Sequence, residues 1–169
     1  VSAYYANKQV AQEYIEKRFT DPLNRVEHKR QVAILNKIIT RTKVKEILEF
    51  APGPGRITTE LCIQNGTSID SSEQMLHIAR ERMAQQGKRW NFIHGNIFDL
   101  NLNSKYQLIF AFRFFLHFKL EERKKVYAQA QALLKDKGFL VLEVMNRNTV
   151  LPLRTVLGRK NYFVYDKLY

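Results

Sequence analysis

The order of strand-like and helix-like segments along this chain of 169 residues is what most limits its fold. Short apolar runs alternate with stretches whose apolar residues recur every three or four positions, which is typical of a parallel sheet with helices on both faces. We therefore predict an α/β fold: a Rossmann-like, doubly wound, mostly parallel sheet of order 3-2-1-4-5 with N-terminal helices. The predicted strands span 44–50, 67–70, 90–95, 106–112 and 139–146.

Proline, glycine and capping residues delimit the predicted helices. Pro22 disfavours helical backbone at the residue before it and so separates the first two helices. Ser71 or Ser72 is expected to cap the fourth helix, while Asn65-Gly66 and Gly87 are read as stops of the third and fourth. The predicted helices span 3–19, 23–40, 56–64, 71–86 and 120–138. The residues of the second helix that we expect to be buried are Val26, Ala33, Ile34 and Ile38.

Length and composition, with 45% apolar and 12% aromatic residues, predict one domain covering 1–169. Within it we expect an N-terminal helical cap at 1–43, the Rossmann-like core at 44–146, and the start of a lid or C-terminal region at 147–169. No apolar run approaches the length of a membrane span, and the N-terminus lacks the apolar core of a signal peptide. We therefore expect a cytoplasmic protein.

Cysteine content and charge narrow the classes of function. Cys62, in a predicted helix, is the only cysteine. A single cysteine excludes an internal disulfide framework and a cysteine-built zinc site. No group of His, Asp and Glu in the sequence has metal-ligand spacing, so no metal is expected. The 28 basic and 16 acidic residues give a net charge of +12, spread over the whole chain. Nucleic acid is thus a possible partner, but a solvated basic surface is the favoured interpretation.

The stretch ILEFAPGPGRIT, residues 47–58, joins the first predicted strand to a predicted helix. In doubly wound folds, ligands bind beyond the carboxyl ends of the strands, where the strand order reverses. Gly53 and Gly55 allow backbone to approach a ligand there, and Pro52 and Pro54 stiffen the turn. The alternative is a plain tight turn without a ligand.

Two further positions place polar groups at the same edge of the sheet. Asp70 ends the second predicted strand, 19 residues after Ala51, which is about the separation at which an acidic residue reaches ribose hydroxyls in dinucleotide sites. Its alternative role is to cap the helix that follows. Gly95 and Asn96 end the third predicted strand, where the amide of Asn96 is suited to an adenine edge. These positions favour a nucleoside-containing ligand.

With these features the chain resembles the class I S-adenosylmethionine-dependent methyltransferases of the small-molecule, methyltransferase 11/25 type. The resemblance covers residues 47–144, in the order that the family shows. A nicotinamide-type pattern is less suitable, because it needs a third glycine where this chain has Thr58. The matching stretches are ILEFAPGPGRIT, GTSIDSSEQMLHIARERM, NFIHGNIFDL, YQLIFAFRFFLHF and AQALLKDKGFLVLEV.

The resemblance implies a cofactor, S-adenosylmethionine, with S-adenosylhomocysteine as the product, and roles for residues at matching positions. Glu49 and the turn at 51–55 would face the methionine end of the cofactor, and Asp70 would hold the ribose hydroxyls. Tyr14, on the first predicted helix, would close over the cofactor or else pack in the core. The predicted cofactor-binding residues are Tyr14, Glu49, Ala51, Pro52, Gly53, Gly55, Asp70, Ser71, Met75, Asn96, Ile97, Ala111, Phe112 and Arg113.

The chain departs from the family pattern at three points. Ala51 stands where the family usually has its first glycine, which is tolerable if φ there is negative, and Asn96 replaces the usual aspartate. The family's sheet continues with two more strands, whereas here only 147–169 follows the fifth. We therefore expect a C-terminally truncated chain, with a compact variant whose edge is covered by a partner as the alternative. The edge strand, 139–146, is expected to be covered by the 150–169 segment or by a second copy in a homo-oligomer.

Methyl transfer needs alignment of the reactants, and a base only when the acceptor must lose a proton. His117 is the candidate base, with packing in the apolar RFFLHF segment as the alternative, while Arg113 is suited to an anionic acceptor. His28 and His77 are expected at the surface or in packing, and His94 in a structural role. The sequence leaves three functions open: a methyltransferase for the O, N or C of a small molecule, an RNA-modifying methyltransferase, and a non-catalytic S-adenosylmethionine-binding protein.

Overall fold

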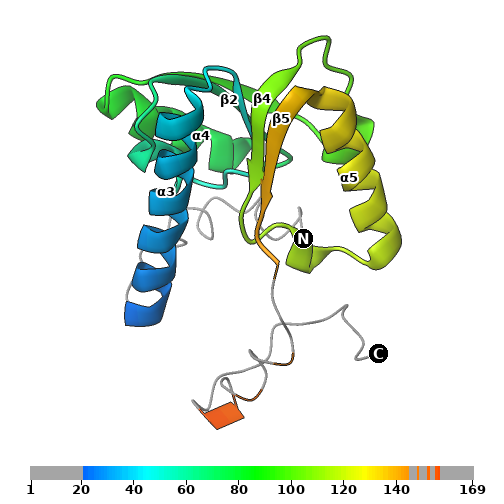
Figure 1. Ribbon diagram of the computed structural model, residues 1–169. Coiled ribbons are helices and arrows are strands. Elements are labelled where there is room, and N and C mark those ends of the chain that lie inside the picture. Colours follow the sequence, from blue (N-terminus) through cyan, green and yellow to red (C-terminus); the bar gives the residue numbers. More distant parts are fainter. Residues whose placement is uncertain (1–20, 145–147, 149–151, 153–154, 157–169) are drawn as a thin grey trace.

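The computed structural model of the chain describes residues 21–144, 148, 152 and 155–156, arranged as Figure 1 shows. The predicted helix 3–19 with Tyr14, the last two residues of the fifth predicted strand and most of 147–169 lie outside the described residues. Within the described part, no helix is long and apolar enough to cross a membrane.

Five parallel strands form the sheet, in the predicted order β3-β2-β1-β4-β5. β1 lies at the centre and all its residues are buried, so its apolar character follows from helices covering both faces. In register, Leu48 of β1 lies opposite Thr67 of β2 on one side and Ile109 of β4 on the other. The strands are β1 (Ile47–Phe50), β2 (Asn65–Asp70), β3 (Arg89–His94), β4 (Tyr106–Ala111) and β5 (Leu134–Leu142).

Helices α3 and α4 lie on one side of the sheet and α5 on the other (Figure 1). α3 begins where the Asp21 carboxylate accepts the Leu23 N–H, and it ends at Lys43 in the left-handed region. Three short 3-10 helices complete the described elements. The helices are α3 (Pro22–Thr42), α4 (Glu73–Gln85) and α5 (Leu120–Leu133), with η1 (Thr58–Glu60), η2 (Ile97–Asp99) and η3 (Phe115–His117).

Alternate residues of β4 build the two cores. Leu108 and Phe110 point to the α3 side, whereas Ile109 and Ala111 point to the α5 side. All four side chains are fully buried. This alternation fixes the register of β4, since a shift by one residue would exchange the two sets of side chains.

The buried face of α3 differs from the prediction. Val26 and Ile34 are about half exposed and Ala33 is exposed, whereas Ile38 is partly buried against the core, as predicted. The helix instead buries a stripe that includes two polar residues, which the apolar pattern alone could not identify. The buried residues are His28, Gln31, Val32, Leu35 and Ile39.

The predicted helix at 56–64 is also wrong, because only the short η1 forms there. Side chains take up the backbone groups that a helix would pair: the Asn36 amide donates to the Glu60 carbonyl and accepts the Cys62 N–H. Cys62 is therefore exposed after η1 rather than inside a helix. Gly66 lies within β2, where an added Cβ would come within 2.4 Å of the Trp90 ring.

The boundary between α5 and β5 lies earlier than predicted. α5 ends at Leu133, and β5 begins at the next residue rather than at 139. Lys137 has φ +62°, and the register to β4 shifts between Tyr106 and Leu108, so an irregular segment replaces the last predicted helical turn. In the described residues β5 pairs only with β4. That its outer edge is covered remains a prediction.

Candidate functional site

A cavity of about 750 Å³ opens at the carboxyl ends of the strands, where the strand order reverses around β1. It brings together most of the predicted site residues from β1, β2, β3 and β4. The predicted residues that line it are Glu49, Ala51, Pro52, Gly53, Asp70, Ser71, Met75, Asn96, Ile97, Phe112, Arg113 and His117.

Three predicted residues do not line this cavity. Gly55 packs against α4, where an added Cβ would lie 3.3 Å from that of Ala79. Ala111 is fully buried in the core between the sheet and α5. Tyr14 lies outside the described residues. Direct cofactor contact is therefore not supported for Gly55 or Ala111, although both shape the backbone around the cavity.

The turn after β1 uses left-handed backbone at both Ala51 and Gly53, with φ of +52° and +56°. The expectation of a negative φ at Ala51 is therefore wrong. A non-glycine residue in this region costs about 1 kcal/mol or more. The turn is held by hydrogen bonds from the Ala51 N–H to the Ile69 carbonyl (2.8 Å) and from the Gly53 N–H to Asp70 Oδ2 (3.1 Å).

The sequence left open whether Asp70 caps the helix that follows it or holds a ribose. In the structure the side-chain cap of α4 is Ser72. Ser72 is the N-cap of α4, where its hydroxyl accepts the Met75 N–H. Asp70 accepts the N–H groups of Gly53 and Ser72 and lines the cavity. Burial raises the pKa of Asp70 above its ordinary value, while these backbone N–H groups act in the opposite direction.

Glu49 is a buried carboxyl group below the turn. It accepts hydrogen bonds from the hydroxyls of Thr58 and Ser68, and Trp90 Nε1 in turn donates to the Ser68 hydroxyl at 2.8 Å. Burial raises the pKa of Glu49 to about 7, although both hydroxyls lower it. A group with this pKa changes charge near neutral pH, at the wall of the cavity.

Asn96 and the phenylalanines near it form the opposite wall. The Asn96 carbonyl oxygen accepts the Phe98 N–H and its amide donates to Asp99, so the side chain caps η2. Phe118 stacks edge-on against Phe98 and Phe114, with ring centroids 5.3 and 4.7 Å apart. This wall is largely apolar and suits a flat ring. The contact predicted between Asn96 and adenine stays a prediction.

The segment after β4 supplies the last predicted residues. Arg113 has φ +57°, and Phe112 and His117 line the cavity beside it. The backbone N–H of His117 donates to the Phe114 carbonyl at the start of η3, and this bond does not involve the imidazole ring. A role for His117 as a base therefore stays a prediction.

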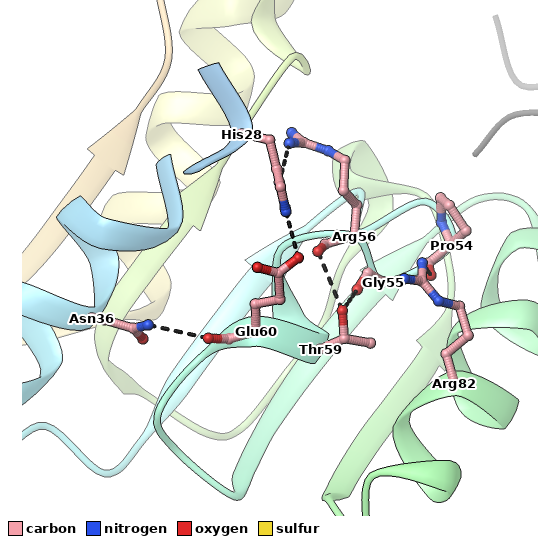
Figure 2. A network of polar contacts seen from close by, with 8 residues as sticks. All are labelled: His28, Asn36, Pro54, Gly55, Arg56, Thr59, Glu60 and Arg82. Atoms are coloured by element: carbon pink, nitrogen blue, oxygen red, sulfur yellow. Dashed lines mark hydrogen bonds and ion pairs between the residues drawn. The ribbon is translucent and has the colours of Figure 1, made fainter. Parts of the chain in front are cut away.

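Sequence reasoning missed a polar network that joins α3 to the turn (Figure 2). Arg56 Nη1 donates to His28 Nδ1 at 2.7 Å, and His28 Nε2 lies 2.6 Å from Glu60 Oε1. Arginine can only donate, so Nδ1 must accept and Nε2 must carry the proton. Of the two places expected for His28, the surface or a packed position, the structure shows the packed one, where the side chain bridges Glu60 and Arg56 and holds Arg56 at the cavity wall.

The remaining histidines do not join the site. His77 lies exposed on α4, and His94 lies exposed at the end of β3, about 3.3 Å from the Ser71 carbonyl. Across the described ranges, no group of three His, Cys, Asp or Glu side chains is arranged to hold a metal ion.

Other cavity residues lie within or beside the predicted motifs but were not among the predicted cofactor-binding residues, although Pro54 belongs to the predicted turn at 51–55 and Gly95 was expected at the ligand edge of the sheet. They are Phe50, Pro54, Arg56, Ile57, Ile69, Ser72, Gly95, Phe98, Phe114, Phe118, Lys119 and Glu122.

The arrangement combines a carboxylate, exposed backbone, a basic side chain and an apolar wall within one cavity. Asp70 offers oxygens to a pair of hydroxyls, Arg56 offers positive charge, and the ring of Phe98 offers an apolar surface. Such a site suits a nucleoside carrying a charged substituent.

Comparison with known proteins identifies the family. A family model described as "Methyltransferase domain" matches residues 47–138, and the chain therefore belongs to this family of methyltransferase domains. A curated protein of Geobacillus sp. (strain WCH70), which carries the name of a methyltransferase, is 29% identical over 108 residues. That match covers 62% of this chain and 44% of the relative, so the chain spans less than half of its length.

Solved structures share the fold. An S-adenosylmethionine-dependent methyltransferase from Clostridium acetobutylicum ATCC 824 superposes with a TM-score of 0.70 at 23% identity, covering 95% of this chain and 65% of that one. The N-methyltransferase NodS from Bradyrhizobium japonicum WM9, in complex with S-adenosylhomocysteine, gives 0.65 at 18% identity, covering 75% and 64%. Magnesium protoporphyrin IX methyltransferase from Synechocystis PCC 6803, also with that product bound, gives 0.67 at 16% identity, covering 82% and 66%.

Proposed function

We propose that the protein transfers a methyl group from S-adenosylmethionine to a small-molecule acceptor, releasing S-adenosylhomocysteine. The observation that carries this proposal is the Asp70 carboxylate, which binds the Gly53 N–H of the turn while facing a cavity where the strand order reverses. The NodS and magnesium protoporphyrin IX methyltransferase structures support it, because each has S-adenosylhomocysteine bound on the same fold.

The residues present fit this cofactor. The cavity is large enough for a nucleoside with an amino-acid substituent, and Gly53 has no atom within 4 Å of where a Cβ would lie, so the turn leaves room for a ligand. Asp70 would hold the ribose, and Met75, Asn96 and Ile97 would surround the adenine. When bound, the cofactor supplies an electrophilic methyl group on a sulfonium.

The protein's own contribution is to align the reactants and to exclude water from them. Arg56, held by His28, offers positive charge beside the turn, where the carboxylate of the methionine end would lie. The apolar wall formed by Phe98, Phe114 and Phe118 would limit the access of water to the bound cofactor. A cytoplasmic location is part of this proposal, and the free, exposed Cys62 is compatible with a reducing compartment.

A second candidate, an RNA-modifying methyltransferase, is favoured by one observation. The exposed side of α3 carries a row of basic residues with the spacing of one helix face, Arg30, Lys37 and Arg41. A ligand that neutralises several of them would be a polyanion. RNA binding whose affinity falls steeply with salt, together with methyl transfer to RNA, would favour this candidate.

The proposed function is tested by isothermal titration of the protein with S-adenosylmethionine and S-adenosylhomocysteine. We expect both to bind, with one site per chain. Adenosine, which lacks the methionine part, should bind more weakly because it cannot reach Arg56. If neither cofactor form binds the folded protein at millimolar concentration, the proposal is wrong.

A further inference from the structure

Four polar side chains from three parts of the chain meet beside the cavity, beyond the ends of β4 and β5. Glu143, just after β5, accepts the Arg113 backbone N–H (2.7 Å) on one oxygen and the Gln31 amide (2.8 Å) on the other. Arg113 Nη1 lies 3.4 Å from Glu27 Oε2, and Glu27 lies close enough to Glu143 to raise the pKa of its carboxyl group. Since Arg113 lines the cavity, we call these four residues the acidic corner of the cavity.

Two atoms of the acidic corner have no partner. Gln31 Oε1 and Arg113 Nε are the buried side-chain atoms, among all residues that the structure describes, that lack a hydrogen bond. Gln31 is 5% exposed, and its amide is directed into the corner because its nitrogen binds Glu143. A buried polar atom without a partner is costly, so a free acceptor and a free donor in one place favour a site for a polar ligand.

The backbone at the acidic corner is strained as well. Arg113 has φ +57°, a region that a long side chain rarely adopts, and the Glu143 carboxylate holds it there through its N–H. Strained backbone that the surroundings enforce is concentrated at sites of binding and catalysis.

The carboxyl groups of Glu27 and Glu143 form a pair in which Glu143 is easier to protonate than an exposed glutamate. Burial raises the pKa of Glu143, and its hydrogen bond and proximity to Glu27 raise it further, while Arg113 acts in the opposite direction. Such a pair accepts a proton more readily than an isolated surface carboxylate does. The Glu27 side chain is 41% exposed and gives this proton a path to solvent.

From this arrangement we propose that the acidic corner is the acceptor subsite and that the acceptor is an amine, which gives up a proton to Glu27 and Glu143. This inference rests on the proposed function. The free oxygen of Gln31 would accept a second N–H of the same amine.

The proposed reaction consists of one proton transfer and one methyl transfer. The ammonium form of the acceptor gives one proton to the carboxylate pair and becomes a neutral amine. Its nitrogen lone pair then forms the new N–C bond while the methyl carbon–sulfur bond breaks and leaves its electron pair on sulfur. The product departs as a methylated ammonium, and Glu27 returns the proton to water.

Other acceptor classes fit the acidic corner less well. An aliphatic alcohol holds its proton too strongly for a carboxylate to remove it, because proton transfer is efficient only between groups of similar pKa. An anionic acceptor would need the positive charge of Arg113, which Glu27 already pairs, and it would meet Glu143 as well.

The test compares three acceptors of one shape, benzylamine, benzyl alcohol and benzoate, in a transfer assay with radiolabelled S-adenosylmethionine. We expect methyl incorporation into benzylamine only, and benzylamine binding to the protein saturated with S-adenosylhomocysteine. In Glu143→Gln and Glu27→Gln the rate should fall by about 100-fold, the contribution typical of a general base. Glu46→Gln, which changes an exposed glutamate paired with Lys135 far from the cavity, should keep the wild-type rate.

Affinity for S-adenosylhomocysteine separates the two proposals. If the wild-type protein does not bind it, the proposed function fails and this inference fails with it. If the protein binds it, the inference alone is overturned by transfer to none of the three probes, by preference for benzyl alcohol or benzoate, or by wild-type rates in both glutamine variants. Unchanged affinity for S-adenosylhomocysteine in the two variants shows that they remain folded.

Discussion

The carboxyl ends of β1 and β2 line the cavity, and the acidic corner lies beside it beyond the ends of β4 and β5, but the polar groups of the two regions are satisfied in different ways. On the β1–β2 side, Asp70 binds two backbone N–H groups and Glu49 binds two hydroxyls. On the β4–β5 side, Gln31 and Arg113 each keep a buried atom without a partner. One half of the cavity is therefore complete without a ligand, and the other is not.

The match to the family model covers the two halves unequally. The complete half contains the turn and the acidic residue at the end of β2, both within the stretch 47–138 that matches the methyltransferase domain. Glu27, Gln31 and Glu143 lie outside that stretch. We infer that the cofactor half is built for a ligand common to the family, while the incomplete half is suited to an acceptor particular to this protein.

The largest effect expected in the complete half concerns Glu49 and pH. Its pKa is raised from 4.5 to about 7 in the folded protein, so between these pH values the folded state binds more protons than the unfolded state. The free energy of unfolding should therefore fall by about 3 kcal/mol as pH rises through this window and then level off. Glu49→Gln should lack this part of the dependence.

Urea unfolding at intervals from pH 4.5 to 8 measures this effect as the difference between wild type and variant. Asp70 and Glu143 also have raised pKa values, so both proteins should retain some loss of stability with rising pH. The control Glu121→Gln changes an exposed glutamate and should follow the wild type. Parallel profiles for wild type and Glu49→Gln would contradict the burial argument.

Asp70→Ala should weaken the binding of S-adenosylhomocysteine by about 1.5–3 kcal/mol, because charge-assisted hydrogen bonds are lost. Asp70→Asn should cost less, since it keeps one acceptor oxygen. Titration calorimetry gives both values, with Asp136→Ala, in the exposed segment before Phe139, as the matched control. Unchanged affinity in Asp70→Ala, combined with a lower melting temperature, would mean that Asp70 only holds the turn.

Lys88→Met should lower the free energy of unfolding by about 2 kcal/mol, because hydrogen bonds from a charged donor are worth roughly 1.5–3 kcal/mol. The Lys88 ammonium donates to the carbonyls of Thr58, Leu61 and Ile63 and so holds the segment behind the turn. Thermal unfolding of this variant beside Lys124→Met, an exposed position, measures the effect. An equal, small loss in both variants would assign no special role to Lys88.

The smallest effect expected is a gain. Ala51→Gly should stabilise the protein by about 0.5–1 kcal/mol, because glycine adopts φ +52° without strain, although part of the gain is offset by the freer unfolded chain. Chemical denaturation at pH 7 measures it. Gly87→Ala, which introduces a side chain at φ +66° outside the cavity, should show the opposite sign. A loss of stability in Ala51→Gly would rule out strain at the turn.

The sequence predicts the sheet and the complete half of the cavity well, because both depend on local signals. Alternation of strands and helices predicts a parallel, doubly wound sheet, for which the order 3-2-1-4-5 is common, and Gly53 and Asp70 lie at or just beyond the ends of their strands. A side chain just beyond the end of a parallel strand must face that edge of the sheet. For Gly53 and Asp70, the local sequence was therefore enough to predict their position at this edge of the sheet.

The incomplete half could not be predicted, because its contacts join positions far apart in the chain. Gln31 and Glu143 lie in different elements, and nothing near either residue marks a partner. The same cause misplaced the buried face of α3, where His28 and Gln31 are buried because polar partners elsewhere receive them. Thr58 and Thr59 in the failed helix at 56–64 illustrate a second cause, since β-branched residues have modest helix propensity.

The two neighbours of β1 also differ in how far along the chain they lie, which bears on the rate of folding. Leu48 pairs with Thr67 across 19 residues but with Ile109 across 61. Closing the longer loop costs about 1 kcal/mol more chain entropy, and non-local pairings slow folding. The β1–β2 pairing is therefore the easier one to nucleate, and β4 joins at the higher cost. A cavity whose walls come from both pairings exists only after the slower one has closed.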